Sequence, residues 1–261
     1  MKWIRWVFRI TASLALAACY ALASCTIGIL VRDFHRRLHW YSRNSCLFTP
    51  LLLKIMGVRV SIVDHTGGQG IMPGTLVVSN HLSYKDIFIL SSIRPVLFIS
   101  SVELSRTFFL GRMARFGGTV FVERRSPAGL RREIRGISDL LRKDFVMTLF
   151  PEARTSDGER LLPFKSALFQ AAIEAGTRVQ PVCIRYSVLD GRLVNSAGRS
   201  RVVWHRTLFL THILKLFTHS RVQAEVEIFS PLNAAQKSRK DLVRQSFGLI
   251  RDCYQKELGK N

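Results

Sequence analysis

The chain has 261 residues, of which 48% are apolar, and it carries a formal net charge of +21 at pH 7. This length and apolar content support one good-sized core, so we expect a single domain behind whatever precedes it. The charge implies an anionic partner, either nucleic acid or a lipid headgroup surface. The five cysteines are odd in number and widely spaced, which excludes a disulfide framework and a zinc site and indicates a reducing compartment.

Two apolar stretches open the chain. Residues 10–31 carry no charge and are long enough to span a bilayer, whereas residues 38–58 are amphiphilic and too polar to span one alone. Basic residues flank the first stretch on both sides, so loop charge gives no orientation. A helical pair that lies in or dips into one leaflet explains both flanks. We therefore interpret residues 1–57 as a membrane-associated helical pair and residues 58–261 as the domain that follows it.

A cleaved signal is the alternative for this segment, because Leu22-Ala23-Ser24-Cys25 resembles a lipoprotein cleavage site. The apolar run continues to Val31, beyond the supposed cut, so we interpret the segment as uncleaved. A basic, cysteine-poor domain also fits the cytoplasmic face of the inner membrane.

A short stretch near the middle of the chain, residues 75–86, carries the predicted chemistry. Residues 76–78 predict a buried strand, and His81 follows its carboxyl end, where open α/β sheets bind ligands. If a helix begins near Ser83, the Asp86 carboxylate can fold back onto one imidazole nitrogen and leave the other facing the crevice. This pattern predicts a general base and its orienting group. The structural alternative is a capping box, Ser83-x-x-Asp86, with His81 as an ordinary loop histidine.

Two later strands also end in polar residues. Residues 116–122 form a glycine turn and an apolar strand that ends at Glu123-Arg124. An arginine there either binds phosphate or carboxylate through its planar fork or is solvated at the surface. Residues 145–150 predict a second buried strand, which Pro151-Glu152 follows. Glu152 is either an acceptor for a hydroxyl or a basic group, or a loop cap.

These segments resemble, in order, the four signature blocks of the glycerolipid acyltransferase family. Asn80-His81-Leu-Ser83-Tyr-Lys-Asp86 matches the first block, NHxSxxD, and the strand ending in Glu123-Arg124 is similar to the second. Residues 150–155, with Lys165 downstream, are similar to the third, Phe-Pro-Glu-Gly-Thr-Arg, and residues 179–184 to the fourth. The third block departs from the family, because Ala153 replaces the glycine and Arg154-Thr155 reverses Thr-Arg. Thr155 therefore occupies the arginine position that the family associates with the acceptor's phosphate.

The resemblance implies an α/β fold, a mixed sheet flanked by helices, behind an N-terminal two-helix anchor. It implies a membrane-associated O-acyltransferase of phospholipid biosynthesis that uses an acyl carrier protein or coenzyme A thioester and a membrane lysolipid. No metal, organic cofactor or nucleic acid is expected. His81 would be the catalytic base and Asp86 its orienting group. The implied substrate contacts are Asn80, Ser83, Glu123, Arg124, Glu152, Arg154, Thr155 and Lys165.

Several alternatives stay open at this stage. Lysophosphatidic acid is narrowly favoured as acceptor, and the altered third block also fits another lysolipid, such as a substituted lysophospholipid or a lyso-ornithine-type aminolipid. A serine hydrolase could use the same histidine and aspartate, but no Gly-x-Ser-x-Gly elbow occurs. A basic nucleic-acid-binding protein would explain the charge but not the apolar N-terminus.

The C-terminal third carries no recognisable motif. Three histidines, His205, His212 and His219, recur at a spacing of seven, which predicts that they lie near one helical face without a close pair. Residues 222–229 alternate in polarity and predict an edge strand. Residues 242–258 predict a final amphipathic helix.

Overall fold

The computed structural model describes residues 2–123 and 126–258. Its strands form one mixed sheet in the order β1-β8-β6-β2-β5-β3-β4, with β7 and β9 paired to β6. The strands are β1 (Val58–Asp64), β2 (Thr75–Ser79), β3 (Leu97–Ser101), β4 (Val120–Val122), β5 (Met147–Leu149), β6 (Arg178–Leu189), β7 (Arg192–Leu193), β8 (Val222–Ile228) and β9 (Leu232–Asn233).

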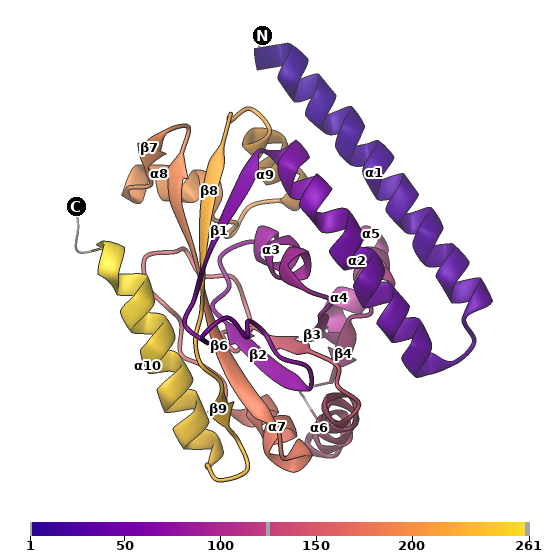
Figure 1. The fold of residues 1–261 in the computed structure, drawn as a ribbon. Helices are drawn as coiled ribbons and strands as arrows, with labels where there is room; N and C mark the ends of the chain where they lie inside the picture. Colours follow the sequence, from indigo (N-terminus) through magenta and orange to yellow (C-terminus); the bar gives the residue numbers. More distant parts are fainter. Residues whose placement is uncertain (1, 124–125, 259–261) are drawn as a thin grey trace.

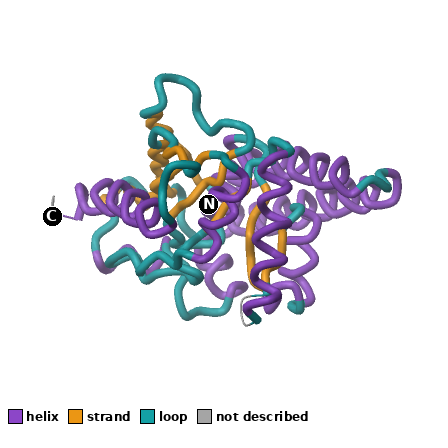
Figure 2. Tube along the Cα trace, turned by 90° about the horizontal axis from the view of Figure 1, so that it is seen from below, coloured by secondary structure: helices purple, strands orange, loops and turns teal. Residues whose placement is uncertain are grey.

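Helices flank this sheet, which confirms the predicted α/β class (Figure 1). Beyond the first two, which are described below, they are α3 (Lys85–Ile93), α4 (Val102–Ser105), α5 (Phe108–Phe116), α6 (Pro127–Arg142), η1 (Ala167–Phe169), α7 (Gln170–Ala175), α8 (Ser196–Val202), α9 (Phe209–Leu216) and α10 (Arg239–Leu258). Seen along the perpendicular direction, purple helices lie on both sides of the orange strands (Figure 2).

The strand directions determine where a site can form. Strands β6, β2, β5, β3 and β4 run parallel, so their carboxyl ends meet at one edge of the sheet. Every residue of β2 is buried, as expected for a strand covered on both faces, and its sequence is correspondingly apolar without alternation. The chain segments that leave β2 and β5 at this edge are the first and third predicted blocks.

The prediction of an edge strand at residues 222–229 is wrong. β8 runs antiparallel to β6 on one side, and β1 pairs with its other side in parallel from Val58–Val222 to Asp64–Ile228. The alternating pattern is present, because Val222, Ala224, Val226 and Ile228 are buried and the residues between them are half-buried. No local pattern indicates that β1 pairs with the other side of β8, since this pairing joins residues more than 160 positions apart.

Two long helices form the N-terminal segment, α1 (Lys2–Leu30) and α2 (Phe34–Met56), and they pack against each other. Asp33 caps α2 by accepting the N–H of Arg36 at 2.7 Å, and Gly57 ends it in the left-handed conformation. α1 is the one helix of the described residues that is long and apolar enough to cross a membrane. α2 also packs on α3, so it belongs to the core as well as to the pair. The division at residue 57 stays a prediction.

The first turns of α1 are attached to the C-terminal half of the chain. Arg5 donates to the carbonyl of Thr218 at 3.0 Å, and the indole N–H of Trp6 donates to that of Leu214 at 3.0 Å. The buried guanidinium of Arg9 donates to the carbonyls of His219 and Ser220. These carbonyls lie at and just beyond the end of α9, where a helix leaves acceptors unpaired. The docking fixes α1 over the body of the protein.

Candidate active site

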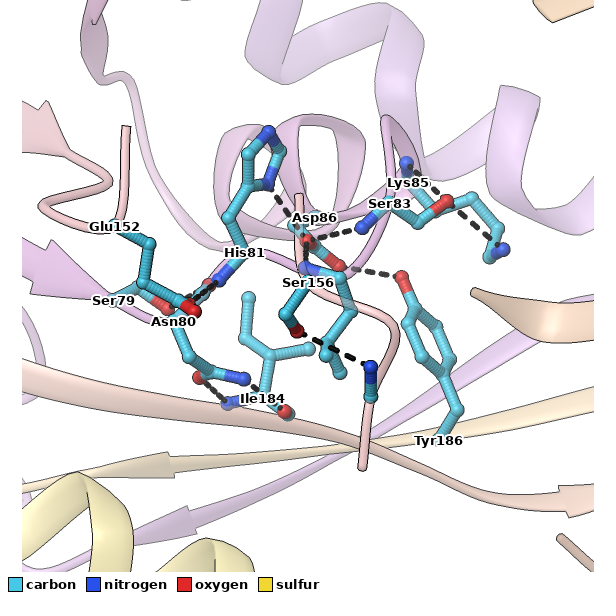
Figure 3. A network of polar contacts seen from close by, with 12 residues as sticks. Ser79, Asn80, His81, Ser83, Lys85, Asp86, Glu152, Ser156, Ile184 and Tyr186 are labelled. Atoms are coloured by element: carbon cyan, nitrogen blue, oxygen red, sulfur yellow. Dashed lines mark hydrogen bonds and ion pairs between the residues drawn. The ribbon is translucent and has the colours of Figure 1, made fainter. Parts of the chain in front are cut away.

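His81 and Asp86 form a hydrogen-bonded pair where the chain leaves β2. The Nδ1 atom of His81 lies 3.0 Å from Oδ2 of Asp86 (Figure 3). β2 ends at Ser79 and α3 begins at Lys85, so Asp86 stands in the first turn of the helix and its carboxylate points back along the loop. The strand–loop–helix turn therefore produces the predicted contact between the imidazole and the carboxylate, and the roles of base and orienting group stay predictions.

The Asp86 carboxylate is fully buried and accepts four hydrogen bonds. Besides His81, Oδ2 accepts the backbone N–H groups of Leu82 at 2.6 Å and Ser83 at 2.8 Å. Oδ1 accepts the hydroxyl of Tyr186 at 2.6 Å. The hydrogen bond from the Ser83 N–H to the Asp86 carboxylate is one half of the predicted capping box. Asp86 therefore both caps the helix and bonds to His81. These four hydrogen bonds hold both oxygens of the carboxylate in place and so fix its orientation toward His81.

The imidazole of His81 is held on its face as well. Its ring stacks on Phe150 with centroids 4.0 Å apart and 15° between the planes, and Phe150 in turn stacks on Phe98. The side chain is 16% exposed. Among the described residues, none forms a hydrogen bond with Nε2. An imidazole that donates from Nδ1 to a carboxylate presents Nε2 as a proton acceptor, which is the state a general base requires.

Glu152, in the loop after β5, connects the third block to the first through hydrogen bonds. Its Oε1 accepts the backbone N–H of His81 at 2.7 Å and its Oε2 accepts that of Leu162 at 2.8 Å. Burial raises the pKa of Glu152 to about 7, although both N–H donors favour the ionised form. Ser156 completes the link, because its N–H donates to the carbonyl of His81 at 2.9 Å. Both carboxylate oxygens are engaged with backbone, so this geometry assigns Glu152 a positioning role, and its contact with substrate stays a prediction.

Two other residues of the first block point into the protein. The buried Asn80 amide joins β2 to β6, donating to the carbonyl of Ile184 and accepting its N–H, both at 2.8 Å. The buried hydroxyl of Ser83 accepts a hydrogen bond from the ammonium of Lys85 at 3.1 Å. The structure thus brings Asn80, Ser83 and Glu152 together around His81 and Asp86.

Within the described part of the chain, the side chains of the remaining predicted substrate-contact residues form no hydrogen bond to the side chains of His81 and Asp86. Arg154 and Lys165 are exposed, and neither side chain hydrogen bonds to another described residue. Thr155 is half-buried, and its carbonyl lies 3.1 Å from Nδ1 of His205. Glu123 follows β4 and lies against Gly129 in the first turn of α6. Arg124 lies outside the described residues.

Three residues of this site are not among those that the sequence patterns predicted. Tyr186 lies two positions beyond the fourth block, on β6, which continues to Leu189. Phe150 opens the third block, just beyond the end of β5, and this position at the carboxyl end of a strand is the signal that could have indicated its contact with His81. Lys85, inside the first block, gave no signal, since nothing local predicts that a lysine is buried.

The prediction for the three C-terminal histidines is also wrong. α9 runs only from Phe209 to Leu216, so His205 precedes it and His219 follows it. His212 is buried, with Nδ1 3.1 Å from the hydroxyl of Tyr84, and burial lowers its pKa to about 4. Within the described part of the chain, no group of three His, Cys, Asp or Glu residues could hold a metal ion.

The fold and the site define an α/β protein with a histidine–aspartate pair at the carboxyl edge of a parallel sheet. The family described as Acyltransferase matches residues 64–185. The chain is 44% identical over 113 residues to a 1-acyl-sn-glycerol-3-phosphate acyltransferase of Neisseria gonorrhoeae, covering 43% of this chain and 44% of that protein, less than half of its length. It is 32% identical to a lyso-ornithine lipid O-acyltransferase of Brucella abortus, covering 94% of each chain.

A solved structure has the same fold. It is the crystal structure of the 1-acyl-sn-glycerophosphate (LPA) acyltransferase PlsC from Thermotoga maritima, with a TM-score of 0.69 and 18% identity over 100% of this chain and 99% of that one. Together with the full-length similarity to the Brucella protein, these matches show that the chain belongs to the glycerolipid acyltransferase family.

The third block provides a test of local strain. Ala153, at the family's glycine position, is exposed and has φ +62°, a conformation that an L side chain adopts at a cost. We predict that Ala153→Gly raises the free energy of unfolding by about 0.5 to 1 kcal/mol, because relief of strain exceeds the entropy that glycine adds to the unfolded chain. Equilibrium denaturation measures the change.

A matched control is Ala128→Gly, at an exposed position in the first turn of α6, where the same substitution should lower stability. An equal loss of stability in both variants would show that Ala153 is not strained.

Proposed function

We propose that this protein transfers a fatty acyl group from an acyl thioester to the free hydroxyl of a lysolipid. The observation that carries the proposal is the Nε2 atom of His81, which faces away from the Asp86 carboxylate while Nδ1 bonds to it. A base in this state can remove the proton of a hydroxyl at neutral pH. The acyltransferases similar to this chain support the reaction class.

The reaction would proceed without an acylated enzyme. His81 Nε2 takes the hydroxyl proton as the hydroxyl oxygen attacks the thioester carbonyl carbon, and Asp86 stabilises the imidazolium that forms. The new C–O bond forms and the C–S bond breaks. The proton then passes from His81 to the leaving thiolate. General base catalysis contributes roughly 10² to 10⁴ in rate, so alignment of the two substrates must supply much of the remainder.

The carrier of the acyl group is a further part of the proposal. Acyl carrier protein and coenzyme A thioesters both offer the carbonyl that this mechanism needs, and we include both. The mechanism uses no metal and no organic cofactor, since the base, its orienting carboxylate and the activated thioester provide every bond change.

For the acceptor we favour a lyso-ornithine lipid over lysophosphatidic acid. The lyso-ornithine lipid O-acyltransferase of Brucella abortus aligns with nearly the whole chain, whereas the Neisseria gonorrhoeae 1-acyl-sn-glycerol-3-phosphate acyltransferase aligns over less than half of it. Thr155 at the family's arginine position also removes the guanidinium associated there with a phosphate. Lysophosphatidic acid remains the second candidate, supported by the 44% identity of the Neisseria match and by the exposed Arg154 guanidinium beside Thr155.

We also propose that the protein is held on the cytoplasmic face of the inner membrane through its N-terminal helices. Large apolar side chains of α1 and α2 face outward, including Trp3 at 76% exposure, Leu22 at 70% and Leu47 at 73%. Exposed apolar surface on this scale is typical of membrane contact. The net charge of +21 would add attraction to anionic lipid.

The first prediction from the proposed function concerns the base. His81→Ala should lower kcat by about 10² or more, because the hydroxyl proton loses its acceptor, while the melting temperature changes little. Asp86→Asn should also be severe, because the amide no longer selects the Nδ1–H tautomer. Turnover of purified variants in mixed micelles measures both. Wild-type turnover by His81→Ala would refute the mechanism.

The second prediction concerns the acceptor, tested by a panel of lysolipids with both thioesters and read by product mass. We expect the lyso-ornithine lipid to be turned over fastest. If Arg154 binds phosphate, Arg154→Ala should raise KM for lysophosphatidic acid about 10- to 150-fold, the value of one charge-assisted pair, and barely affect the lyso-ornithine lipid.

Arg135→Ala, an exposed site on α6, is the control and should leave both acceptors unchanged. Lysophosphatidic acid as the fastest substrate would reverse our preference.

The third prediction concerns the membrane. The protein should stay with membranes through a wash of about 1 M salt, because burial of apolar side chains is not screened as charge is. Leu14→Glu with Leu22→Glu, both exposed on α1, should release a large fraction into the supernatant. Leu193→Glu, equally exposed but on β7, should not. Complete release of the wild type by salt would contradict the proposal.

A further inference from the structure

Lys85 is a fully buried lysine that the acyl-transfer mechanism does not use. It follows Tyr84 and precedes Asp86 in the first block, and its side chain has no exposed surface. Burying an ammonium group costs several kcal/mol unless it is paired and hydrogen-bonded, so a lysine at this position suggests a role other than filling space. An apolar side chain of the same length would fill the space without that cost.

The ammonium is held by two oxygens and two rings. Nζ donates to the hydroxyl of Ser83 at 3.1 Å and to the carbonyl of Val202. It lies 4.6 Å from the ring centroid of Tyr186 and 5.4 Å from that of Tyr84. Cations bind the face of an aromatic ring through its quadrupole, and the attraction is largest where water is excluded.

Tyr186 connects this cation to the catalytic pair. Its hydroxyl donates to Oδ1 of Asp86 at 2.6 Å, on the oxygen that His81 does not use, as Figure 3 shows. A cation over the ring draws electron density from the phenol and strengthens the bond that its O–H donates. Both effects stabilise negative charge on Asp86 and hold its second oxygen in place.

We propose that Lys85 and Tyr186 are positioning residues for the His81–Asp86 pair: the Lys85 side chain fixes the Tyr186 ring, and the Tyr186 hydroxyl fixes and partly neutralises the Asp86 carboxylate. Neither residue touches the reacting atoms. This inference rests on the proposed function of the pair as a general base. It adds that Lys85 and Tyr186 adjust how strongly Asp86 stabilises the protonated form of His81.

The ionisable groups around Lys85 come from four segments. Asp86 adjoins it on α3, Tyr84 precedes that helix, Tyr186 lies on β6, and His212 on α9 is neutral at pH 7 because burial lowers its pKa to about 4. Burial also lowers the pKa of Lys85 to about 7, and the Asp86 charge opposes that shift. Below about pH 7, Lys85 is therefore mostly an ammonium ion.

This arrangement predicts the direction of a measurable change. Removing the positive charge of Lys85, or the hydrogen bond of Tyr186, leaves more uncompensated negative charge on Asp86. An imidazolium beside a stronger negative charge is more stable, so the neutral form of His81 should appear at higher pH. A residue that served only packing would lower stability without moving this midpoint.

The test measures the neutral fraction of His81 directly, without a lipid substrate. Diethyl pyrocarbonate modifies neutral imidazole, and peptide mass analysis gives its rate at His81 from pH 5 to 8 in the full-length protein. We expect Lys85→Met and Tyr186→Phe each to raise the midpoint by about 0.5 pH unit or more. In the double variant the shift should be smaller than the sum of the two single shifts, because Lys85 acts on Asp86 through Tyr186.

Matched controls separate this effect from lost packing. Tyr254→Phe removes another buried hydroxyl, one that donates to the carbonyl of Gly158 at 2.6 Å, and Lys143→Met removes an exposed ammonium at the end of α6. Both should leave the midpoint unchanged. Lysolipid turnover by the Lys85 and Tyr186 variants should fall about tenfold in kcat with KM unchanged.

Unchanged midpoints in folded Lys85→Met and Tyr186→Phe proteins would overturn the inference. If Lys85→Met does not fold, Lys85→Arg, which keeps the charge, and Tyr186→Phe decide it, with a shift expected only for the latter. The experiments distinguish the two proposals. Shifted midpoints in the Lys85 and Tyr186 variants, with no lysolipid turnover by the wild type, would refute the proposed function alone. Normal turnover with fixed midpoints would sink the inference alone.

Discussion

The structure of the site depends on one buried carboxylate, that of Asp86. A carboxylate without exposed surface needs hydrogen-bond donors, and this one has two backbone N–H groups, an imidazole and a phenol. Because the four donors come from the loop after β2 and from β6, satisfying the charge also fixes the loop, the ring of His81 and the neighbouring strand. The same hydrogen bonds that offset the cost of the buried charge therefore favour the Nδ1–H tautomer that the proposed mechanism requires.

The sheet topology brings the parts together. β2, β5 and β6 are adjacent and parallel, so the chain leaves each of them at the same edge. Glu152 after β5 then reaches the backbone of His81 after β2, and Asn80 reaches β6. The third block thus positions the backbone of the first, while Arg154 is exposed and available for the acceptor contact that we propose. This division explains how one framework can serve acceptors with different headgroups.

Local patterns in the sequence predicted the parts that local physics controls. The buried run before His81 became β2, and the helix expected over residues 242–258 is α10. The His81–Asp86 contact was predictable because both residues lie in one turn. The contacts of Tyr186, the burial of Lys85 and the pairing of β1 with β8 were not, because each joins segments 100 or more residues apart. No short-range pattern encodes such pairings.

The central claim is that Asp86 holds His81 as the Nδ1–H tautomer with Nε2 free of a proton. Nitrogen-15 chemical shifts of the His81 ring, assigned by comparison with a His81→Asn variant, test it most directly, since protonated and bare ring nitrogens resonate far apart. Above the titration range of the ring, the account predicts a protonated Nδ1 and a bare Nε2 in the wild type, with that preference lost in Asp86→Asn. A wild-type protein that carries its proton on Nε2 would contradict the account.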